Sequence, residues 1–294
     1  MVIVNYRAGQ LANRLIHFSH FIANSKAFGY KLVYPFFQEY REFFEFGDPD
    51  FEEGRIQLDY PVGLLFIYRK IQQLIRSLEK RGKRVSSVFF REFHILSKNS
   101  LEDPFFNMRD PLFTAKACHK VLITNGWLYR DEESFGLYAN EIRNIFTLKN
   151  HYRELVRKQI EESRKNADIL IGVHIRRGDY KDFNYGSWYY EDEVYLKNMK
   201  SIEAFYKKNG KVCNFFIASN EKVPLKNFSG LNAKWEERHF IIDLYSLASC
   251  DYIIGPPSTY SGWAAFFGKV PLFHIESADS TIDERNITRF TPLS

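Results

Sequence analysis

The stretch Asp168–Tyr180 (DILIGVHIRRGDY) joins an apolar run to a cluster of charged residues. Its first part, 168–175, is nearly free of polar side chains, which is the pattern of a parallel strand buried on both faces. Similar runs follow at 215–218, 252–254 and 272–275, and helical patterns separate them. Strands that alternate with helices predict an α/β fold with a doubly wound parallel sheet in this half of the chain.

The chain opens with a strand, a turn and a helix. Val2–Tyr6 is a short apolar run, and apolar residues then recur at helical spacing from Leu11 to Phe28. Gly29 is a suitable helix stop, and Lys31–Tyr34 resembles a second strand that Pro35 ends. The pattern therefore predicts a βαβ opening.

The middle of the chain is less regular. We expect an aromatic and acidic excursion over 36–62, a basic helix over 64–84, short strands over 87–90, 93–96 and 121–124, and helices over 133–145 and 152–165. The character of the sequence changes after the last of these helices. We place a domain boundary between residues 150 and 166, which gives domains 1–160 and 161–294.

Composition excludes several classes of protein. The 294 residues are 45% hydrophobic and 26% charged, a normal globular balance that argues against disorder. The net charge of +5 favours anionic ligands only weakly, and no basic stripe with interleaved aromatic residues predicts nucleic-acid binding. Three widely spaced cysteines form neither a metal-ligand pattern nor a disulfide framework, which suits a cytoplasmic protein.

Residues 64–84 carry the nearest approach to a membrane signal. Their apolar residues recur at helical spacing among seven lysines and arginines, a pattern typical of helices on an anionic membrane surface. A solvated helix packed by its apolar stripe explains the same pattern and is the favoured interpretation. We see no apolar run long enough to span a bilayer and no signal peptide, so we expect a cytoplasmic protein that can make peripheral contact with the inner face of the membrane.

Polar side chains follow three of the predicted C-terminal strands. In an open parallel sheet, ligands bind beyond the carboxyl ends of the strands, so these three groups are expected to meet at one cleft. The groups are His174, Arg176, Arg177 and Asp179; Ser219, Asn220 and Glu221; and Gly255–Ser261.

This combination of residues is suited to binding phosphate. Ser258 and Thr259 would begin a helix over 260–267, where backbone N–H groups and the helix dipole favour an anion. An arginine adds bidentate contacts to phosphate oxygens, so a pyrophosphate could be held without a metal ion. The leaving group of a nucleotide sugar is a pyrophosphate whose charge grows as the glycosidic bond breaks. The Asp48-Pro49-Asp50 pair does not follow a strand, and we do not interpret it as a divalent-ion site.

Less specific interpretations exist for each residue. Arg176 and Arg177 would also suit a surface ion-pair network with Asp179 and Asp182, and Ser258 would suit an ordinary helix N-cap. His174 would equally suit a hydrogen-bonded histidine at a strand end. The Arg-Gly-Asp tripeptide at 177–179 ends a buried strand, so we do not predict an adhesive loop.

The segment His174–Tyr180 resembles the H-x-R-R-G-D-Y motif of the α-1,2-fucosyltransferases, which belong to a wider group of enzymes that use GDP-fucose. Six further segments resemble that family in the same order along the chain: Gly9–Arg14, Asn125–Tyr129, Glu141–Phe146, Phe216–Asn220, Asp243–Cys250 and Ser258–Trp263. The sequence departs from the family pattern at Arg14, Asn220 and Gly262 and in the insertion over 36–62. These departures concern the linkage and the acceptor above all.

The resemblance implies a GT-B architecture, in which two Rossmann-like domains face each other across a cleft, and inverting, metal-independent transfer of fucose from GDP-fucose to a glycan hydroxyl. It implies that the N-terminal domain is on the acceptor side and that the C-terminal domain binds the nucleotide sugar. Arg176 would clamp the pyrophosphate with support from His174 and Arg177, and Asp179 would orient that arginine or act as general base. The remaining implied contacts are Ser258, Thr259, Tyr260 and Ser261 to phosphate, Asn220 or Glu221 to guanine, and Gly9 and Asn13 to the sugar.

Two other functions remain open. The protein could transfer a different nucleotide-activated sugar, or it could be a catalytically silent glycan- or nucleotide-binding protein of the same fold. The expected acceptor is an oligosaccharide or polysaccharide, with bacterial surface polysaccharide as a destination. Aromatic residues suited to stacking on acceptor sugars, although core packing explains each equally well, are Trp127, Tyr129, Trp188, Tyr189 and Tyr190.

Overall fold

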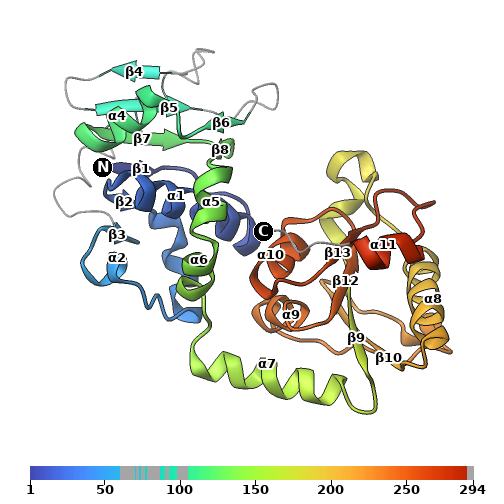
Figure 1. Ribbon diagram of the computed structural model, residues 1–294. Coiled ribbons are helices and arrows are strands. Elements are labelled where there is room, and N and C mark those ends of the chain that lie inside the picture. The colour runs from blue at the N-terminus through green and yellow to red at the C-terminus, as the bar shows by residue number, and fades with distance from the viewer. Residues whose placement is uncertain are drawn as a thin grey trace. The chain divides into compact units, whose positions relative to one another are not determined.

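The computed structural model describes residues 1–59, 87–89, 93–97 and 105–289, together with positions 70, 73 and 77. The chain divides into two compact units, Met1–Thr147 and Leu148–Ser294. Each unit has its own sheet, mainly parallel in the first unit and entirely parallel in the second (Figure 1). The helix expected over 64–84 lies outside the described residues. Among those that are described, no helix is long and apolar enough to cross a membrane.

The first unit is built on a sheet with the strand order β3-β2-β1-β7-β5-β4, in which only the β4–β5 pair is antiparallel. A short parallel pair, β6–β8, lies outside this sheet. The strands are β1 (Val2–Val4), β2 (Leu32–Val33), β3 (Ile56–Gln57), β4 (Ser87–Phe89), β5 (Phe93–Ser97), β6 (Phe106–Asn107), β7 (Val121–Asn125) and β8 (Tyr129–Arg130). The helices are α1 (Leu11–Phe28), η1 (Pro35–Phe43), α2 (Pro49–Glu52), α4 (Pro111–His119), α5 (Glu132–Leu137) and α6 (Ala139–Ile145).

The predicted βαβ opening is confirmed. Helix α1 ends where expected, because Gly29 adopts the left-handed conformation at φ 72° and donates its N–H to the carbonyl of Ser25 at 2.8 Å. The prediction of an irregular excursion over 36–62 is wrong in part. Ile56 is buried and pairs with Leu32, so this segment supplies β3 to the sheet.

The helix predicted over 133–145 is two helices. The first begins at Asp131, whose carboxylate caps the N–H of Ser134 at 2.9 Å, and the break falls at Tyr138, which leaves the helical conformation. Apolar spacing alone did not reveal this break, because Leu137 is 74% exposed while Ile142 and Ile145 are buried.

The second unit has the strand order β11-β10-β9-β12-β13, all parallel. Its first strand in sequence is central, and the chain returns to the other side of that strand with β12. This is a doubly wound sheet whose order reverses between β9 and β12, and ligands bind at such switch points. The strands are β9 (Ile169–Ile175), β10 (Cys213–Ser219), β11 (Ala233–Lys234), β12 (Tyr252–Gly255) and β13 (Leu272–His274). The helices are α7 (Asn150–Ser163), η3 (Gly178–Lys181), η4 (Phe183–Gly186), α8 (Asp192–Lys208), η5 (Leu225–Phe228), α9 (Phe240–Leu247), α10 (Thr259–Gly268) and α11 (Glu284–Arg289).

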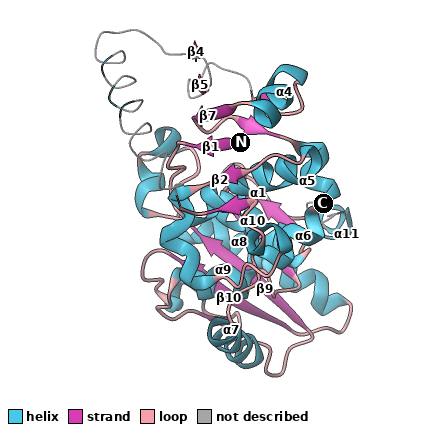
Figure 2. Cartoon of the chain, turned by 90° about the vertical axis from the view of Figure 1, so that its left-hand side faces the viewer, coloured by secondary structure: helices cyan, strands magenta, loops and turns pink. Residues whose placement is uncertain are grey.

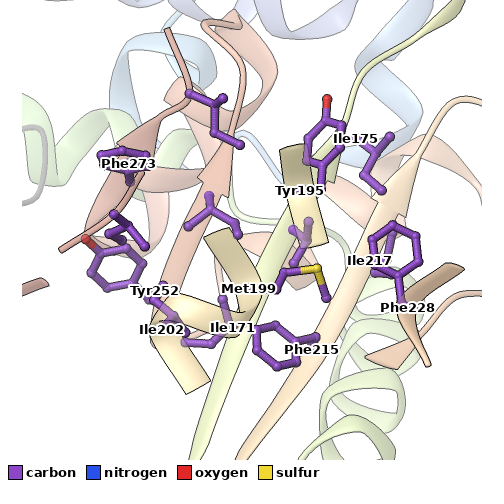
Figure 3. Packing of buried hydrophobic residues seen from close by; sticks show 14 of the residues in the cluster. Ile171, Ile175, Tyr195, Met199, Ile202, Phe215, Ile217, Phe228, Tyr252 and Phe273 are labelled. Carbon is purple, nitrogen blue, oxygen red and sulfur yellow. The ribbon is translucent and has the colours of Figure 1, made fainter. Parts of the chain in front are cut away.

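Alternation along β9 assigns its side chains to two faces. Ile171, Val173 and Ile175 point into a core that α8 covers with Tyr195 and Met199 (Figure 3). A Cβ at Gly172 would lie 2.8 Å from Leu247 of α9, which places the even-numbered residues on the other face. Helices α8 and α11 lie on the first face and α9 and α10 on the second (Figure 1), and Figure 2 shows the same strands between helices. The α/β fold predicted from the apolar runs is therefore confirmed.

Helices α9 and α10 meet at a glycine. A Cβ added at Gly268 would lie 1.9 Å from the carbonyl oxygen of Ala248, which is backbone and has little freedom to move. At Gly262, in the same helix, nothing lies within 4 Å of the added atom. The close approach of the two helices therefore depends on the missing side chain at Gly268 and not on glycine in general.

We expect Gly268→Ala to destabilise the second unit by about 2–3 kcal/mol, because the helices must separate to relieve the overlap. Gly262→Ala should instead stabilise it by about 0.5–1 kcal/mol, because alanine is the better residue inside a helix. Urea unfolding followed by circular dichroism measures both changes. Equal midpoints for the two variants would contradict the packing described.

Candidate functional site

The carboxyl ends of β9 and β12 lie side by side at the switch point of the second unit. Gly255 of β12 is the register partner of His274 on β13 and lies against His174 of β9, because a Cβ at Gly255 would lie 2.8 Å from the carbonyl oxygen of His174. His174 in turn pairs with Ala218 of β10. The two histidines therefore share one lateral row of the sheet, and the residue between them has no side chain.

His174 is buried in the face covered by α10. Its ring lies 5.0 Å from the ring of Tyr260, and its Nδ1 has no hydrogen-bond partner among the residues that the structure describes. Burial, with smaller contributions from Arg176 and His274, lowers the pKa of His174 to about 3. The imidazole is therefore neutral at physiological pH, and it supports the site without adding positive charge to it.

The two adjacent arginines follow the alternation of β9 and point to different faces. Arg177 lies on the α8 side, where its guanidinium binds the carboxylate of Asp192 at the start of that helix. Asn227 donates to the other oxygen of Asp192 at 2.6 Å. Both side chains of the pair are about nine-tenths buried. Burial alone would lower the pKa of Arg177, but the pairing with Asp192 raises it. Arg177 therefore stays charged and bound to Asp192, and this ion pair holds the loop.

Arg176 lies on the side of α10. Its Nη2 is 2.7 Å from the carboxylate of Asp179, and its guanidinium carbon is 5.4 Å from the centre of the Tyr180 ring. The Asp179 side chain is 62% exposed. An ion pair with such an exposed partner is worth little in water, so an anionic ligand can replace it.

The start of α10 contributes backbone donors. Ser258 caps the helix by accepting the N–H of Tyr260 at 3.2 Å, and Thr259 is the first helical residue. The Tyr180 hydroxyl donates to the carbonyl of Pro257 at 2.8 Å and so ties this loop to the one after β9. The structure thus brings the Arg176 loop and the α10 N-terminus together.

Two of the predicted phosphate contacts have other roles. The Ser261 hydroxyl is buried and donates to the carbonyl of Ser258 at 3.3 Å. The Tyr260 hydroxyl donates to the carbonyl of Phe240 at 2.6 Å and so connects α10 to α9. Sequence reasoning grouped all four residues of 258–261 because hydroxyls are common ligands, but only the helix geometry shows where each one points.

Asn220 follows β10 and connects two loops of the same unit. Its side-chain oxygen accepts the backbone N–H of Arg177 at 2.9 Å. A Cβ at Gly178, where φ is +60°, would lie 2.7 Å from its amide nitrogen. Glu221 is exposed beside it, and its N–H is bound by the Ser219 hydroxyl at 3.2 Å. Of the two groups predicted to bind the base, Glu221 is exposed, whereas the Asn220 oxygen is bound to the backbone of Arg177.

Gly9 and Asn13 lie in the first unit, after β1. Gly9 has φ +47°, and a Cβ there would lie 2.3 Å from the amide nitrogen of Asn13. The nearly fully buried Arg14 donates to the carbonyls of Gly9, at 2.9 Å from Nη2, and Phe36, at 2.6 Å from Nη1, and it pairs with Glu39. This arginine, a departure from the family pattern, therefore fixes the glycine turn from within.

The Asp48-Pro49-Asp50 pair binds a lysine. The Lys26 ammonium lies 3.0 Å from Asp48, 2.9 Å from Asp50 and 3.1 Å from Glu141. Burial would lower the pKa of Lys26, but the hydrogen bonds to these carboxylates outweigh it and raise that pKa. Within the described residues, no group of three or more histidine, cysteine, aspartate or glutamate side chains is arranged to hold a metal ion.

The aromatic residues singled out for sugar stacking differ in exposure. Tyr129 and Tyr190 are buried and belong to the cores of their units. Trp127 is half-buried. Its ring lies 5.4 Å from the ring of His17, centroid to centroid, and 4.4 Å from the guanidinium carbon of Arg130. Trp188 and Tyr189 are half-buried in the loop after β9.

Sequence reasoning missed Asp192, Asn227 and His274. Asp192 opens a helix 13 residues beyond Asp179 and carried no motif. His274 ends the last strand of the sheet, so its position at a strand end was a usable signal, but its register beside Gly255 was not visible in the sequence.

Comparison with known proteins identifies the family. The model of glycosyl transferase family 11 matches residues 75–279, more than two thirds of the chain. The chain belongs to glycosyl transferase family 11. It is therefore a glycosyltransferase, which confirms the enzyme class that the motifs predicted. No curated protein matches the chain significantly.

Solved structures show the same fold. A mutant of Arabidopsis thaliana FUT1 in complex with GDP has a TM-score of 0.60 at 13% identity, over 97% of this chain and 71% of that one. The fucosyltransferase NodZ from Bradyrhizobium has a TM-score of 0.53 at 16% identity, over 93% and 95%. POFUT1 in complex with GDP has a TM-score of 0.52 at 14% identity, over 93% and 98%. These similarities support the predicted GT-B-like fold class.

Removal of the Lys26 ammonium should be costly. We expect Lys26→Met to lower the free energy of unfolding by about 3–5 kcal/mol, because it removes the cation bound by the buried carboxylate of Asp48 and leaves Asp50 with Arg55 alone. Lys31→Met, at an exposed position, should change it by less than about 0.5 kcal/mol. Urea unfolding measures both. Equal stability of the two variants would contradict the role assigned to Lys26.

The neutral state of His174 makes stability depend on pH. Between pH 6.5 and pH 3, His174 is protonated in the unfolded state but not in the folded state. The free energy of unfolding therefore falls as the pH falls through this range. In His174→Gln the slope of unfolding free energy against pH should be smaller by up to about 1.4 kcal/mol per pH unit. His151→Gln, at an exposed site, controls for the substitution itself. Urea midpoints from pH 4 to 7 test this, and an unchanged slope would contradict it.

Proposed function

We propose that this glycosyltransferase moves fucose from GDP-fucose to a hydroxyl group of a glycan, with inversion at the sugar carbon and without a metal ion. The observation that carries the proposal is the position of Arg176, beside the N-terminus of α10 at the switch point of the second unit. The three structural neighbours support the choice of donor, because two contain GDP and the third is a fucosyltransferase by name.

The chemistry needs stabilisation of the departing diphosphate. As the bond between the sugar carbon and the β-phosphate oxygen breaks, negative charge grows on the diphosphate. Arg176 supplies a bidentate cation, and the N–H groups at the start of α10 supply oriented dipoles. These two contributions take the place that a divalent ion has in other transferases. Arg177 contributes indirectly, because its pairing with Asp192 fixes the loop that presents Arg176.

The acceptor oxygen forms its bond to the sugar carbon while its proton leaves. Inversion requires the acceptor to approach from the side opposite the diphosphate, and an exposed carboxylate can take the proton. Asp179 is exposed and lies 2.7 Å from Arg176, so binding of the diphosphate to Arg176 would release it for this role. Asp182 and Glu221 are the other exposed carboxylates of these loops.

Glu221 is proposed to bind the base. Guanine presents adjacent N–H donors that a carboxylate accepts in pairs, whereas uracil does not. The Asn220 oxygen already accepts the backbone N–H of Arg177, so Glu221 is the carboxylate that remains for the base. We further propose that Gly9 and Asn13 of the first unit contribute to the sugar site and that an α-1,2 linkage is formed.

The decisive experiment is calorimetric titration of GDP, GDP-fucose and UDP in the presence of a chelator. Wild type should bind both guanine nucleotides with micromolar affinity and UDP much more weakly. Arg176→Ala should weaken GDP binding by a factor of about 100, since a charge-assisted bidentate contact is worth roughly 3 kcal/mol. Glu221→Gln should reduce the preference for GDP over UDP.

Arg157→Ala is the matched control, because Arg157 is an exposed arginine on α7 that pairs with Glu154 and Glu161. It should bind GDP as wild type does. Nucleotide binding without release of fucose in the presence of glycans would indicate the silent binding protein, and a preference for UDP would indicate another donor. Binding that requires a divalent ion, or that survives Arg176→Ala, would refute the proposed site.

A further inference from the structure

The loop that follows Arg176 displays aromatic rings to solvent. Phe183 is 52% exposed and Tyr185 is fully exposed, although both lie in a short helical turn, η4, next to the catalytic edge of the sheet. Large apolar side chains on a loop of this length are normally folded inward. Exposed aromatic groups close to a reactive site are therefore candidates for substrate contact.

The rings form one connected stack that begins at Arg176. The guanidinium carbon of Arg176 is 5.4 Å from the Tyr180 ring, and the Tyr180 ring is stacked on Phe183 with centroids 5.4 Å apart and an interplanar angle of 24°. Trp188 contacts both rings, at 5.9 Å from Phe183 and 6.4 Å from Tyr180. We refer to Tyr180, Phe183 and Trp188 as the aromatic stack.

The base of the stack is anchored to the α10 loop. Tyr180 is buried, and its hydroxyl donates to the carbonyl of Pro257 immediately before Ser258. The stack is thus fixed to both of the elements proposed to hold the diphosphate. The exposed ring of Phe183 is therefore held at a fixed distance from the place where the sugar carbon would react.

The backbone is adapted to presenting Tyr185. Tyr185 has φ +56°, a left-handed conformation that residues other than glycine seldom adopt, and Gly186 follows with φ +73°. A Cβ at Gly186 would lie 3.0 Å from the carbonyl oxygen of Lys181, so the turn closes tightly. The strain at Tyr185 brings no buried contact in return, since the side chain is fully exposed.

Charge around the rim indicates which ligand fits. The exposed carboxylates of Asp179 and Asp182 are balanced by Arg176 and Lys181, so the surface is locally neutral. A neutral pyranose satisfies such a surface, because its C–H face packs on an aromatic ring while its hydroxyls bond to carboxylates and to an ammonium group. An anionic surface or a nucleic acid would instead meet the exposed carboxylates of Asp179 and Asp182.

We propose that the aromatic stack, extended by Tyr185, is the subsite that binds the acceptor of the transfer, a neutral oligosaccharide whose sugar ring lies on Phe183. This inference rests on the proposed function, since it assigns the acceptor side of the same reaction. It selects the loop Gly178–Tyr190 of the second unit over the other aromatic residues of the chain.

The test uses the full chain and defined disaccharides. Binding of lactose, cellobiose and maltose is measured by saturation-transfer NMR, with and without saturating GDP, for wild type, Phe183→Ala and Tyr185→Ala. We expect at least one disaccharide to bind wild type and to bind roughly ten-fold more weakly to Phe183→Ala, the loss typical of a stacking contact. Phe205→Ala is the control, because Phe205 is half-buried at the end of α8 and lies outside the loop.

GDP affinity of the same samples separates this inference from the proposed function. Unchanged GDP binding in Phe183→Ala, with sugar binding lost, supports the subsite. If wild type binds GDP but none of the three disaccharides, or if Phe183→Ala binds them as wild type does, the subsite is refuted and the donor site stands. If GDP does not bind, the donor site fails, and the titrations without nucleotide still decide whether the stack binds sugar. Co-sedimentation with vesicles of phosphatidylglycerol that Phe183→Ala abolishes, with sugar binding unaffected, would assign the rings to a membrane and overturn the inference.

Discussion

The close contact between β9 and β12 is the constraint on which the site depends. A side chain at Gly255 would collide with the backbone of His174, so glycine sets the spacing of the two central strands at the switch point. That spacing puts the loop that starts at Arg176 beside the loop that starts α10. The same register row continues to His274, so a buried and a half-buried histidine lie on either side of Gly255, and burial keeps His174 uncharged.

Strand alternation then gives two identical side chains different functions. Arg177 continues the odd-numbered face of β9 and meets Asp192 on α8, whereas Arg176 continues the even-numbered face and meets Asp179 and the ring of Tyr180. One arginine is buried and holds the backbone, and the other pairs with an exposed carboxylate. The pairing of a fixed and an exchangeable guanidinium explains why consecutive arginines serve an anion site better than either would alone.

Four of the five strands of the second unit could be predicted because runs such as 168–175 and 252–254 are nearly free of polar side chains, and their loops at the carboxyl edge could be predicted from parallel topology. The two-residue strand β11 was missed. Directions of side chains could not. Ser261 and Tyr260 lie in a hydroxyl-rich segment, yet their hydroxyls are used within the fold. Strand β3 was missed because two residues, Ile56–Gln57, are too short for periodicity, and Asp192 because its role depends on packing between elements distant in sequence. The family resemblance supplied the donor, which no residue pattern specified.

The net charge of +5 is a poor guide to the anion site, because several cations of this chain are already neutralised inside the fold. Lys26 is held by Asp48, Asp50 and Glu141, Arg14 by Glu39, and Arg238 by Asp243. In each case the side chain of the cation is more than nine-tenths buried, so loss of its carboxylate partners would leave a charge inside the fold. Arg176 differs because its side chain is 20% exposed and its partner Asp179 is 62% exposed, so a diphosphate can take the place of Asp179 without leaving a buried charge. Function here follows from which cation has a replaceable partner and not from how many cations there are.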